Sequence, residues 1–143
     1  MLDGRIAQAI MSIPAVKAVE VGAGVDSAHL KGSQMHDEIF VDRNKNVSRQ
    51  TNNAGGIEGG MTNGETLIVK GTMKPIPTMR KSLATVDLKD MTPANAHFER
   101  SDTCAVPACS VVAEARVAII IVDELLAKIG GDSLVEMKAH YGM

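Results

Sequence analysis

The feature that most constrains this chain is a glycine-rich run at residues 51–78, TNNAGGIEGGMTNGETLIVKGTMKPIPT. Its first half carries five glycines: Gly55, Gly56, Gly59, Gly60 and Gly64. Glycine adopts positive φ and lets other groups approach its backbone, so the cluster favours either a tight hairpin or a wall against a flat or anionic ligand. The run matches neither the Walker nor the dinucleotide-binding pattern, and both interpretations stay open.

The run closes on a short cationic segment made of Lys74, Pro75, Ile76, Pro77 and Thr78. The lysine offers a point charge, and the two prolines stiffen the backbone that carries it. This segment is compatible with a pocket for an anion or nucleotide. A solvated surface lysine is the alternative.

Composition narrows the class of protein. The chain has 143 residues, 2% aromatic residues and a net charge of −2. Its length suits one domain that buries about 70% of its unfolded surface. Base stacking and phosphate tracking need aromatic and basic residues, so a nucleic-acid partner is disfavoured. The two cysteines, Cys104 and Cys109, predict reduced structural thiols and a cytoplasmic protein. No apolar run reaches the roughly 18 residues of a membrane span, and no signal-peptide pattern is present.

The first half of the chain predicts one helix and two strands. Apolar residues recur at helical spacing over residues 2–13, and Pro14 ends that helix. Residues 15–21 alternate as a half-buried strand, and residues 67–73 form another with a bulge at Gly71. Residues 42–50 are expected to form an exposed loop, and residues 79–99 a long loop with one short strand at 82–88. The abrupt opening suggests a cut inside a larger protein.

The second half predicts a long helix over about residues 107–129, with Pro107 in its first turn. Ser101, Asp102 or Thr103 would cap or precede it, and Gly130-Gly131 would end it. Its middle is apolar all round, which indicates a buried central helix. A short final helix would begin at Asp132 or Ser133 and end near His140. The expected fold class is therefore α+β, with helices layered against an antiparallel β-sheet.

Two sets of polar residues could take part in binding or catalysis. Arg100 and Asp102 precede the long helix, where they could form an anion clamp and a proton-handling carboxylate, or an ordinary cap and a surface ion pair. His36, Asp37 and Glu38 place an imidazole beside carboxylates. Surface or structural hydrogen bonding is favoured over catalysis for these three residues.

Several motifs together resemble one known family. TNNAGGIEGGMTNGE, KPIPT and RSDTCAVPACSVVAEA resemble the C-terminal part of chorismate synthase, as do SIPAVKAVEVGAG and GSQMHDEI. They follow in the family's order, at close to its spacing, from about residue 2 to residue 129. The resemblance implies that residues 1–143 form the C-terminal portion of a chorismate-synthase-like domain.

The resemblance also implies an activity. The family is a carbon–oxygen lyase of the shikimate pathway to aromatic amino acids. It converts 5-enolpyruvylshikimate 3-phosphate to chorismate and phosphate by anti-1,4-elimination. The reaction needs reduced FMN, and NADPH only in members that reduce their own flavin. A homotetramer is the family's assembly. No metal is implied.

Site residues follow from the motifs. The resemblance assigns Pro14, Ala15 and Gly59 to flavin contact, and Arg100 to the same cofactor site. It assigns the five residues of KPIPT to cofactor binding: Lys74, Pro75, Ile76, Pro77 and Thr78. Asp102 resembles the family's aspartate that helps to move a proton from the reduced ring, a role that suits a carboxylate in a tight site.

Other family elements are missing from this sequence. No GESHG-like, GHAD-like or RSSARET-like string occurs, and His29, His36, His97 and His140 lie in other contexts. Cys109 and Arg116 depart from the family's usual residues. Arg116 would face a groove or partner, or else bury a charge at a cost. The isolated chain is therefore expected to be inactive. The alternatives are a non-catalytic FMN- or phosphate-binding module and a structural or assembly fragment.

Overall fold

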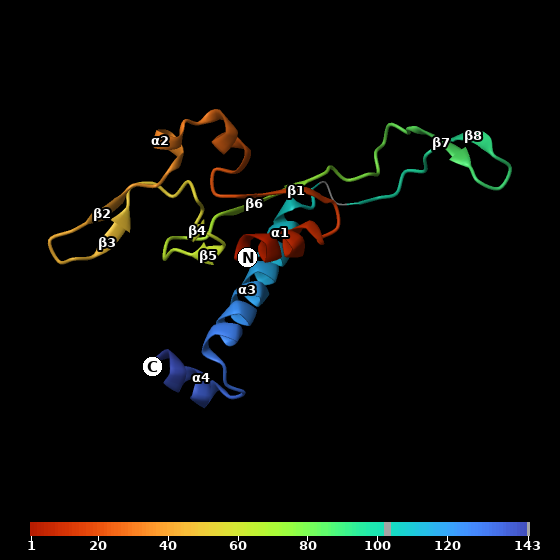
Figure 1. Cartoon of the computed structure of the whole chain (residues 1–143). Coiled ribbons are helices and arrows are strands. Elements are labelled where there is room, and N and C mark those ends of the chain that lie inside the picture. Colours follow the sequence, from red (N-terminus) through yellow and green to blue (C-terminus); the bar gives the residue numbers. More distant parts are fainter. Residues whose placement is uncertain (102–103, 143) are drawn as a thin grey trace.

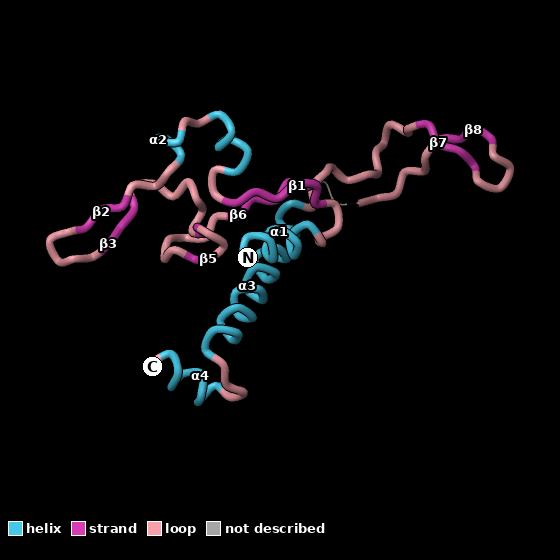
Figure 2. The backbone as a smooth tube through the Cα atoms, in the orientation of Figure 1, coloured by secondary structure: helices cyan, strands magenta, loops and turns pink. Residues whose placement is uncertain are grey.

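The structure is a computed structural model that describes residues 1–101 and 104–142. Helices stand toward both ends of the chain, and small antiparallel strand pairs fill the part between them, which confirms the expected α+β class (Figure 1). Two hairpins reach out on opposite sides, and a long helix projects away from both (Figure 2). The packed part lies where these three extensions meet.

Helix α1, Leu2–Met11, supplies the centre of the core, and the predicted first helix is confirmed. Ile6 is fully buried, and the core around it is completed by Leu2, Ile10, Ile13, Val16 and Ile57. The helix ends at Ser12, two residues before Pro14, because the residue before a proline avoids the helical region.

A two-stranded sheet lies against this helix. Strand β1, Val16–Val21, pairs antiparallel with β6, Val69–Met73, so both predicted strands are confirmed. The register is irregular between Val16 and Ala18, which places the bulge on β1, so the expected bulge at Gly71 is wrong. Gly71 has another role: an added Cβ would lie 3.4 Å from Ile10 Cγ2, so glycine lets α1 approach the sheet closely.

Three hairpins account for the remaining strands. Their bounds are β2 Ile39–Val41 with β3 Val47–Arg49, β4 Ile57–Glu58 with β5 Met61–Thr62, and β7 Ala84–Asp87 with β8 Thr92–Asn95. A 3-10 helix, Gly24–His29, and a short helix α2, Gly32–Met35, precede them. The strand expected within 82–88 is confirmed. The loop expected at 42–50 is wrong in part because it contains β3, and β8 was not predicted, since its proline and polar residues are untypical of strands.

The long helix α3, Val106–Ile129, has the predicted extent. Its N-cap is Ala105, without a side-chain cap, so Ser101 precedes the helix and does not cap it. Asp102 and Thr103 lie outside the described residues. The structure describes all of α3 and buries none of its residues, so the expected burial is wrong for this chain. Arg116 is exposed, so no charge is buried there. Only one face of α3 meets the core.

The chain's last predicted elements are confirmed. Gly130 ends α3 with φ 66°, which suits a glycine, and Ser133 caps α4, Leu134–Tyr141, by accepting a hydrogen bond from Glu136 N. Helix α3 is fixed to α1 by Arg5, which pairs with Asp123 and, at 2.6 Å, with Glu124. The hydrogen bonds to these two carboxylates raise the pKa of Arg5 above its ordinary value.

Candidate functional site

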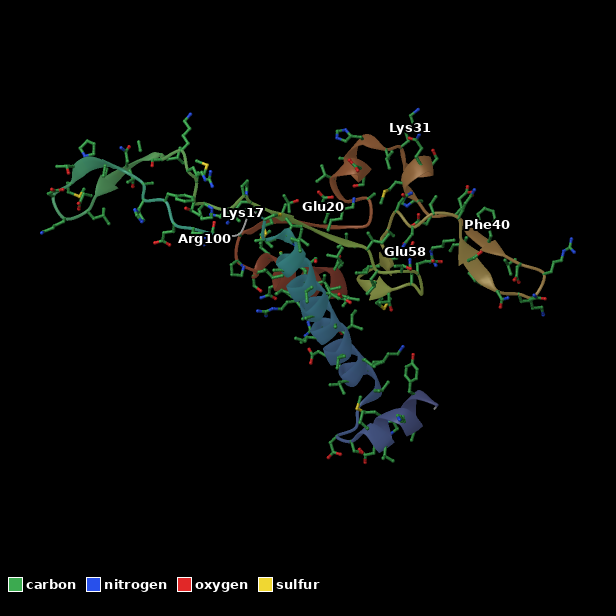
Figure 3. The ribbon with its side chains drawn as sticks, turned by 180° about the vertical axis from the view of Figure 1, so that it is seen from behind. Lys17, Glu20, Lys31, Phe40, Glu58 and Arg100 are labelled. Atoms are coloured by element: carbon green, nitrogen blue, oxygen red, sulfur yellow. The ribbon has the colours of Figure 1, made fainter. Side chains whose placement is uncertain are left out.

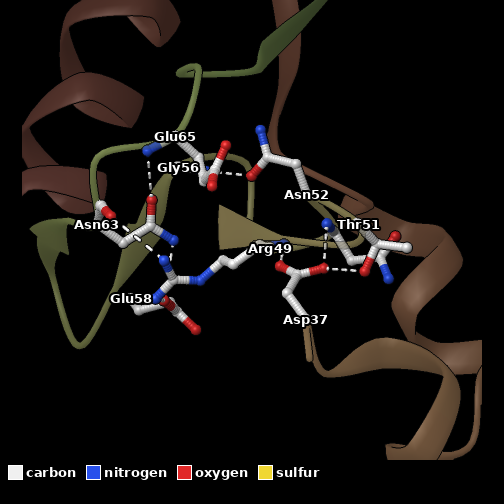
Figure 4. A network of polar contacts seen from close by, with 10 residues as sticks. Asp37, Arg49, Thr51, Asn52, Gly56, Glu58, Asn63 and Glu65 are labelled. Carbon is white, nitrogen blue, oxygen red and sulfur yellow. Dashed lines mark hydrogen bonds and ion pairs between the residues drawn. The ribbon is translucent and has the colours of Figure 1, made fainter. Parts of the chain in front are cut away.

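The buried carboxylate of Asp37 holds the start of the glycine-rich run (Figure 4). It accepts hydrogen bonds from Thr51 Oγ1 at 2.6 Å, Asn53 N at 2.8 Å and Ala54 N at 2.9 Å. Burial raises the pKa of Asp37, but the hydrogen bonds and the charge of Arg49 outweigh it and lower the pKa below its ordinary value. The expectation of structural hydrogen bonding in this segment is therefore confirmed for Asp37.

Side chains of the run and of β3 continue this network. Asn52 accepts from Gly56 N at 2.9 Å and donates to the carbonyl of Thr66 at 2.8 Å. Glu58 accepts from Arg49 at 2.6 Å and from Asn63 Nδ2 at 2.8 Å (Figure 4). These contacts fix the shape of the glycine-rich run without any ligand.

Close packing against the chain's own backbone explains why two of these positions require glycine. An added Cβ on Gly55 would lie 2.3 Å from Gly22 N, and one on Gly22 would lie 2.0 Å from the carbonyl oxygen of Asn53. Contacts below 3.0 Å require something to shift, so only glycine fits at either position. Gly56 is likewise closed in by the backbone of Thr66, so this half of the run faces protein rather than a ligand.

Gly59 and Gly60 form the turn of the β4–β5 hairpin. Both have positive φ, 58° and 78°, as the tight two-residue hairpin turn requires. This bears out the hairpin interpretation of the run. Gly59 is exposed, and an added Cβ there would meet nothing within 4 Å, so its surface is open to a ligand.

The segment around Pro14 lies directly beside the start of KPIPT. Lys74 N donates to the carbonyl oxygen of Ala15 at 2.8 Å. Ala15 has φ 70°, a left-handed conformation that is strained for a residue with a Cβ. Strained backbone of this kind gathers at binding sites, and here it brings together two segments that the motifs assign to one cofactor.

A second link joins KPIPT to the segment of Arg100. Thr78 Oγ1 donates to the carbonyl of Glu99 and accepts from Glu99 N, both at 3.0 Å. Arg100 follows in the loop that leads from β8 toward α3 (Figure 3). Three of the four predicted segments are thus held in a row, by one backbone hydrogen bond and by the Thr78 hydroxyl.

An open hollow of about 770 Å³ lies between KPIPT and the loop at residues 98–101. Its walls are formed by Pro75, Ile76, Thr78, Met79, Arg80, Phe98, Arg100 and Ser101. The hollow combines apolar and aromatic surface with two guanidinium groups, which suits a flat, anionic ligand. Pro14, Ala15, Gly59, Lys74 and Pro77 do not line it. Gly59 lies in the β4–β5 turn beside Gly60, whose carbonyl oxygen accepts a hydrogen bond from Leu2 N at the start of α1.

Arg80 and Phe98 are the residues that sequence reasoning missed. Arg80 lies two residues after KPIPT and Phe98 two residues before Arg100. Their closeness to the two motifs was the only available signal, because only the tertiary structure decides that these two segments face each other. Asp102, the predicted catalytic carboxylate, lies outside the described residues.

Among the described residues, the histidine and cysteine candidates do not line this hollow. His140 Nδ1 lies 2.8 Å from the carbonyl oxygen of Ile129 and joins α4 to the end of α3. Nowhere in residues 1–101 and 104–142 do three or more His, Cys, Asp or Glu side chains gather so as to hold a metal ion. Cys104 and Cys109 are free thiols, as expected. No helix in the described part of the chain is long and apolar enough to cross a membrane.

The fold is of the α+β class, and its hollow combines two arginines with apolar surface, an arrangement that suits a flat, anionic ligand. The comparisons define the family. The family model for chorismate synthase matches residues 1–126. The chain belongs to the chorismate synthase family.

Individual relatives agree with this assignment. The chain is 52% identical to the chorismate synthase of Geobacter metallireducens, over 98% of this chain and 37% of the relative. It is 56% identical to that of Brevibacillus brevis, over 97% of this chain and 36% of the relative. A solved chorismate synthase structure matches with a TM-score of 0.76 and 45% identity, over 99% of this chain and 34% of that one. The chain spans little more than a third of the length of its relatives.

Proposed function

We propose that this chain supplies one part of the flavin and substrate site of a chorismate synthase. The observation that carries the proposal is the row of contacts from Ala15 through Lys74 and Thr78 to Glu99, next to Arg100. These contacts join residues far apart in the sequence, and the row ends at the hollow that Thr78 and Arg100 line. The whole activity would be the elimination of phosphate and a ring proton from 5-enolpyruvylshikimate 3-phosphate, which yields chorismate.

The residues present fit part of an FMN site. The hollow offers Pro75, Ile76 and Phe98 as apolar surface, with Arg80 and Arg100 for negative charge. The exposed, left-handed backbone at Gly59 can accept a flat ring without a steric clash. Bound reduced FMN would supply a transient electron to the substrate, with no net redox change.

The chain's own residues would bind and orient the reactants. Arg100 and Lys74 would stabilise anionic charge on flavin or phosphate, because guanidinium and ammonium groups form charge-assisted hydrogen bonds with such oxygens. Pro14, Ala15 and the rigid KPIPT segment would fix the position of the ring. Asp102 would accept or hold the proton that leaves the reduced ring.

The proposal extends to partners and location. The substrate would be 5-enolpyruvylshikimate 3-phosphate. The enzyme would act in the cytoplasm, and the complete enzyme would be a homotetramer. NADPH would take part only if the enzyme reduces its own flavin. The histidine-containing and RSSARET-like strings are missing from this sequence, so we expect the chain by itself to catalyse no turnover.

An anaerobic titration with reduced FMN, followed by calorimetry with and without the phosphorylated substrate, tests this proposal. We expect saturable binding that weakens about tenfold or more in Arg100→Ala and in Lys74→Ala, because each loses a charge-assisted contact. Lys31→Ala is the matched control, since this exposed lysine lies at the start of α2, away from Arg100 (Figure 3).

Circular dichroism of each variant shows whether it is folded. If the folded wild-type chain binds no reduced FMN, or if all three variants bind like the wild type, the proposed half-site is wrong for this chain. Turnover of the substrate by pure chain with reduced FMN would contradict the expected inactivity.

A further inference from the structure

The hollow at KPIPT lies between the packed core and the β7–β8 hairpin, along the two segments that connect them (Figure 1). Two contacts continue the antiparallel pairing of the hairpin toward the core. Ala96 N donates to the carbonyl oxygen of Leu83 at 2.8 Å, and the Thr78 hydroxyl bonds the backbone of Glu99 at 3.0 Å. The two segments therefore run side by side in opposite directions as far as Thr78.

The Thr78–Glu99 contact divides the hollow into two parts. Arg80 and Phe98 lie in the outer part, because their positions in the chain fall between the two contacts. Arg100 lies in the inner part, on the side of the core. Since an extended segment advances about 3.3 Å per residue, Arg80 lies up to about 7 Å beyond Thr78. A ligand that fills the hollow would meet one guanidinium group in each part.

Neither guanidinium group is paired with a carboxylate in the described part of the chain. The ion pairs within residues 1–101 and 104–142 engage Arg5, Arg49 and Lys70, but not Arg80 or Arg100. Both residues of the hollow are exposed. A guanidinium group can donate two parallel hydrogen bonds to a phosphate, so each of these side chains is available to an anionic ligand.

The two arginines are suited to different ends of one ligand. The segments that the motifs assign to the flavin, around Ala15 and Lys74, lie on the inner side of Thr78. A flavin ring would therefore occupy the inner part, near Arg100. The tail that carries the phosphate would extend into the outer part, where Arg80 lines the hollow.

We propose that Arg80 is a specificity-determining residue, which makes the hollow selective for a ligand with a terminal phosphomonoester over the same ligand without it. The inference rests on the proposed function, under which this group is the phosphate of FMN. A phosphomonoester carries a charge of about −1.5 to −2 at pH 7. It therefore forms charge-assisted hydrogen bonds with a guanidinium group that the neutral hydroxyl of riboflavin cannot match.

Anaerobic calorimetric titrations of this chain with reduced FMN and with reduced riboflavin test the inference. The wild-type chain should bind FMN about tenfold or more tightly than riboflavin. Arg80→Gln should weaken FMN binding about tenfold and change riboflavin binding less than about twofold, so that the preference is lost. Arg80→Lys should keep part of the preference, since an ammonium group retains the charge but not the two parallel hydrogen bonds.

Lys81→Gln is the matched control. It removes the same charge from the next residue, which is exposed and does not line the hollow. Both flavin affinities should stay within about twofold of the wild-type values. All three variants should keep the circular dichroism spectrum of the wild-type chain, because both positions are exposed in it.

The phosphorylated substrate carries the same chemical group, so it is titrated separately in the presence of reduced FMN. We expect Arg80→Gln to leave the affinity for the substrate unchanged. A loss of substrate affinity, with the preference for FMN over riboflavin intact, would place the phosphomonoester on the substrate and overturn its assignment to FMN.

Two further results separate this inference from the proposed function. If the wild-type chain binds FMN and Arg80→Gln weakens both flavins equally or neither of them, the inference is overturned and the proposed function stands. Phenyl phosphate, titrated by ³¹P NMR, is a phosphomonoester without a flavin ring. If a folded chain binds neither flavin but binds phenyl phosphate, and Arg80→Gln abolishes that binding, the proposed function alone is contradicted. A folded chain that binds none of these ligands would contradict both.

Discussion

Two regions of this molecule, which we call the packed unit and the arm, are stabilised by different kinds of contact. The packed unit consists of α1, β1, β6, residues 51–60 and Asp37, which binds them, and the arm is residues 74–101. In the packed unit Ile6 is fully buried and Asp37 is 8% exposed. In the arm Leu88 is 79% exposed and Met91 72%, and backbone pairing with a few polar contacts maintains its shape.

This difference separates stability from binding. Gly55 could have been part of a ligand wall, but the backbone of Gly22 accounts for it. Asp37, as expected, makes structural hydrogen bonds. Arg100 and Thr78 line a hollow that nothing in the described chain fills. Substitutions in the packed unit should therefore change the free energy of unfolding. Substitutions at the hollow should instead change ligand affinity.

The largest effect is expected for Gly55→Ala. The new methyl group would lie within 2.5 Å of the backbone of Gly22, at a residue with φ 65°. Overpacking and backbone strain together predict a loss of about 3–5 kcal/mol in the free energy of unfolding. Urea denaturation followed by circular dichroism measures it.

Gly59→Ala is the control for that variant. It has a similar φ of 58° and no atom within 4 Å of the added Cβ, so only the backbone cost of about 1–2 kcal/mol applies. Equal losses in the two variants would show that close packing is not what requires a glycine at position 55.

Asp37→Asn should have an intermediate effect. The amide cannot accept all three hydrogen bonds, and its NH₂ group would face donors, so we expect a loss of about 1–3 kcal/mol. Because the folded-state pKa of Asp37 is lowered, its ionised form stabilises the fold above the unfolded-state pKa. That contribution is lost as the pH falls through the folded-state pKa.

Urea denaturation at pH 7 and at a series of acidic pH values checks both statements. The difference between wild type and Asp37→Asn should shrink on acidification. Asp42→Asn is the control, since Asp42 also accepts three hydrogen bonds, but in an exposed turn. A difference that is constant with pH, or an equal loss in the control, would contradict the assigned role of Asp37.

The smallest effect on stability is expected for Thr78→Val in the arm. It removes the hydroxyl that joins KPIPT to Glu99, but the site is half exposed, so the loss should stay below about 1 kcal/mol. The affinity for reduced FMN should fall several-fold as the hollow loosens. Thr92→Val, which removes a hydroxyl contact to Asp90 in the β7–β8 turn, should leave the affinity unchanged. Equal FMN affinities in both variants would contradict the proposal that FMN binds at the hollow.

The sequence predicted the elements whose signals are local. The apolar spacing before Pro14 defined α1, and Pro107 and Gly130 bracketed α3. Ser133 predicted the start of α4. Motifs within the chain also predicted the family. Several short motifs in the same order identify a family even when the contacts between residues are unknown.

Contacts between distant residues were decided only by the tertiary structure. Gly22 and Gly55 approach each other across 33 positions, Asp37 binds the backbone at Asn53, and Arg80 meets Arg100 at one hollow. The amino-acid pattern of α3 showed that it is apolar all round. Only the fold revealed that one face meets the core while the opposite face is bare, because burial depends on which surfaces are present to pack against it.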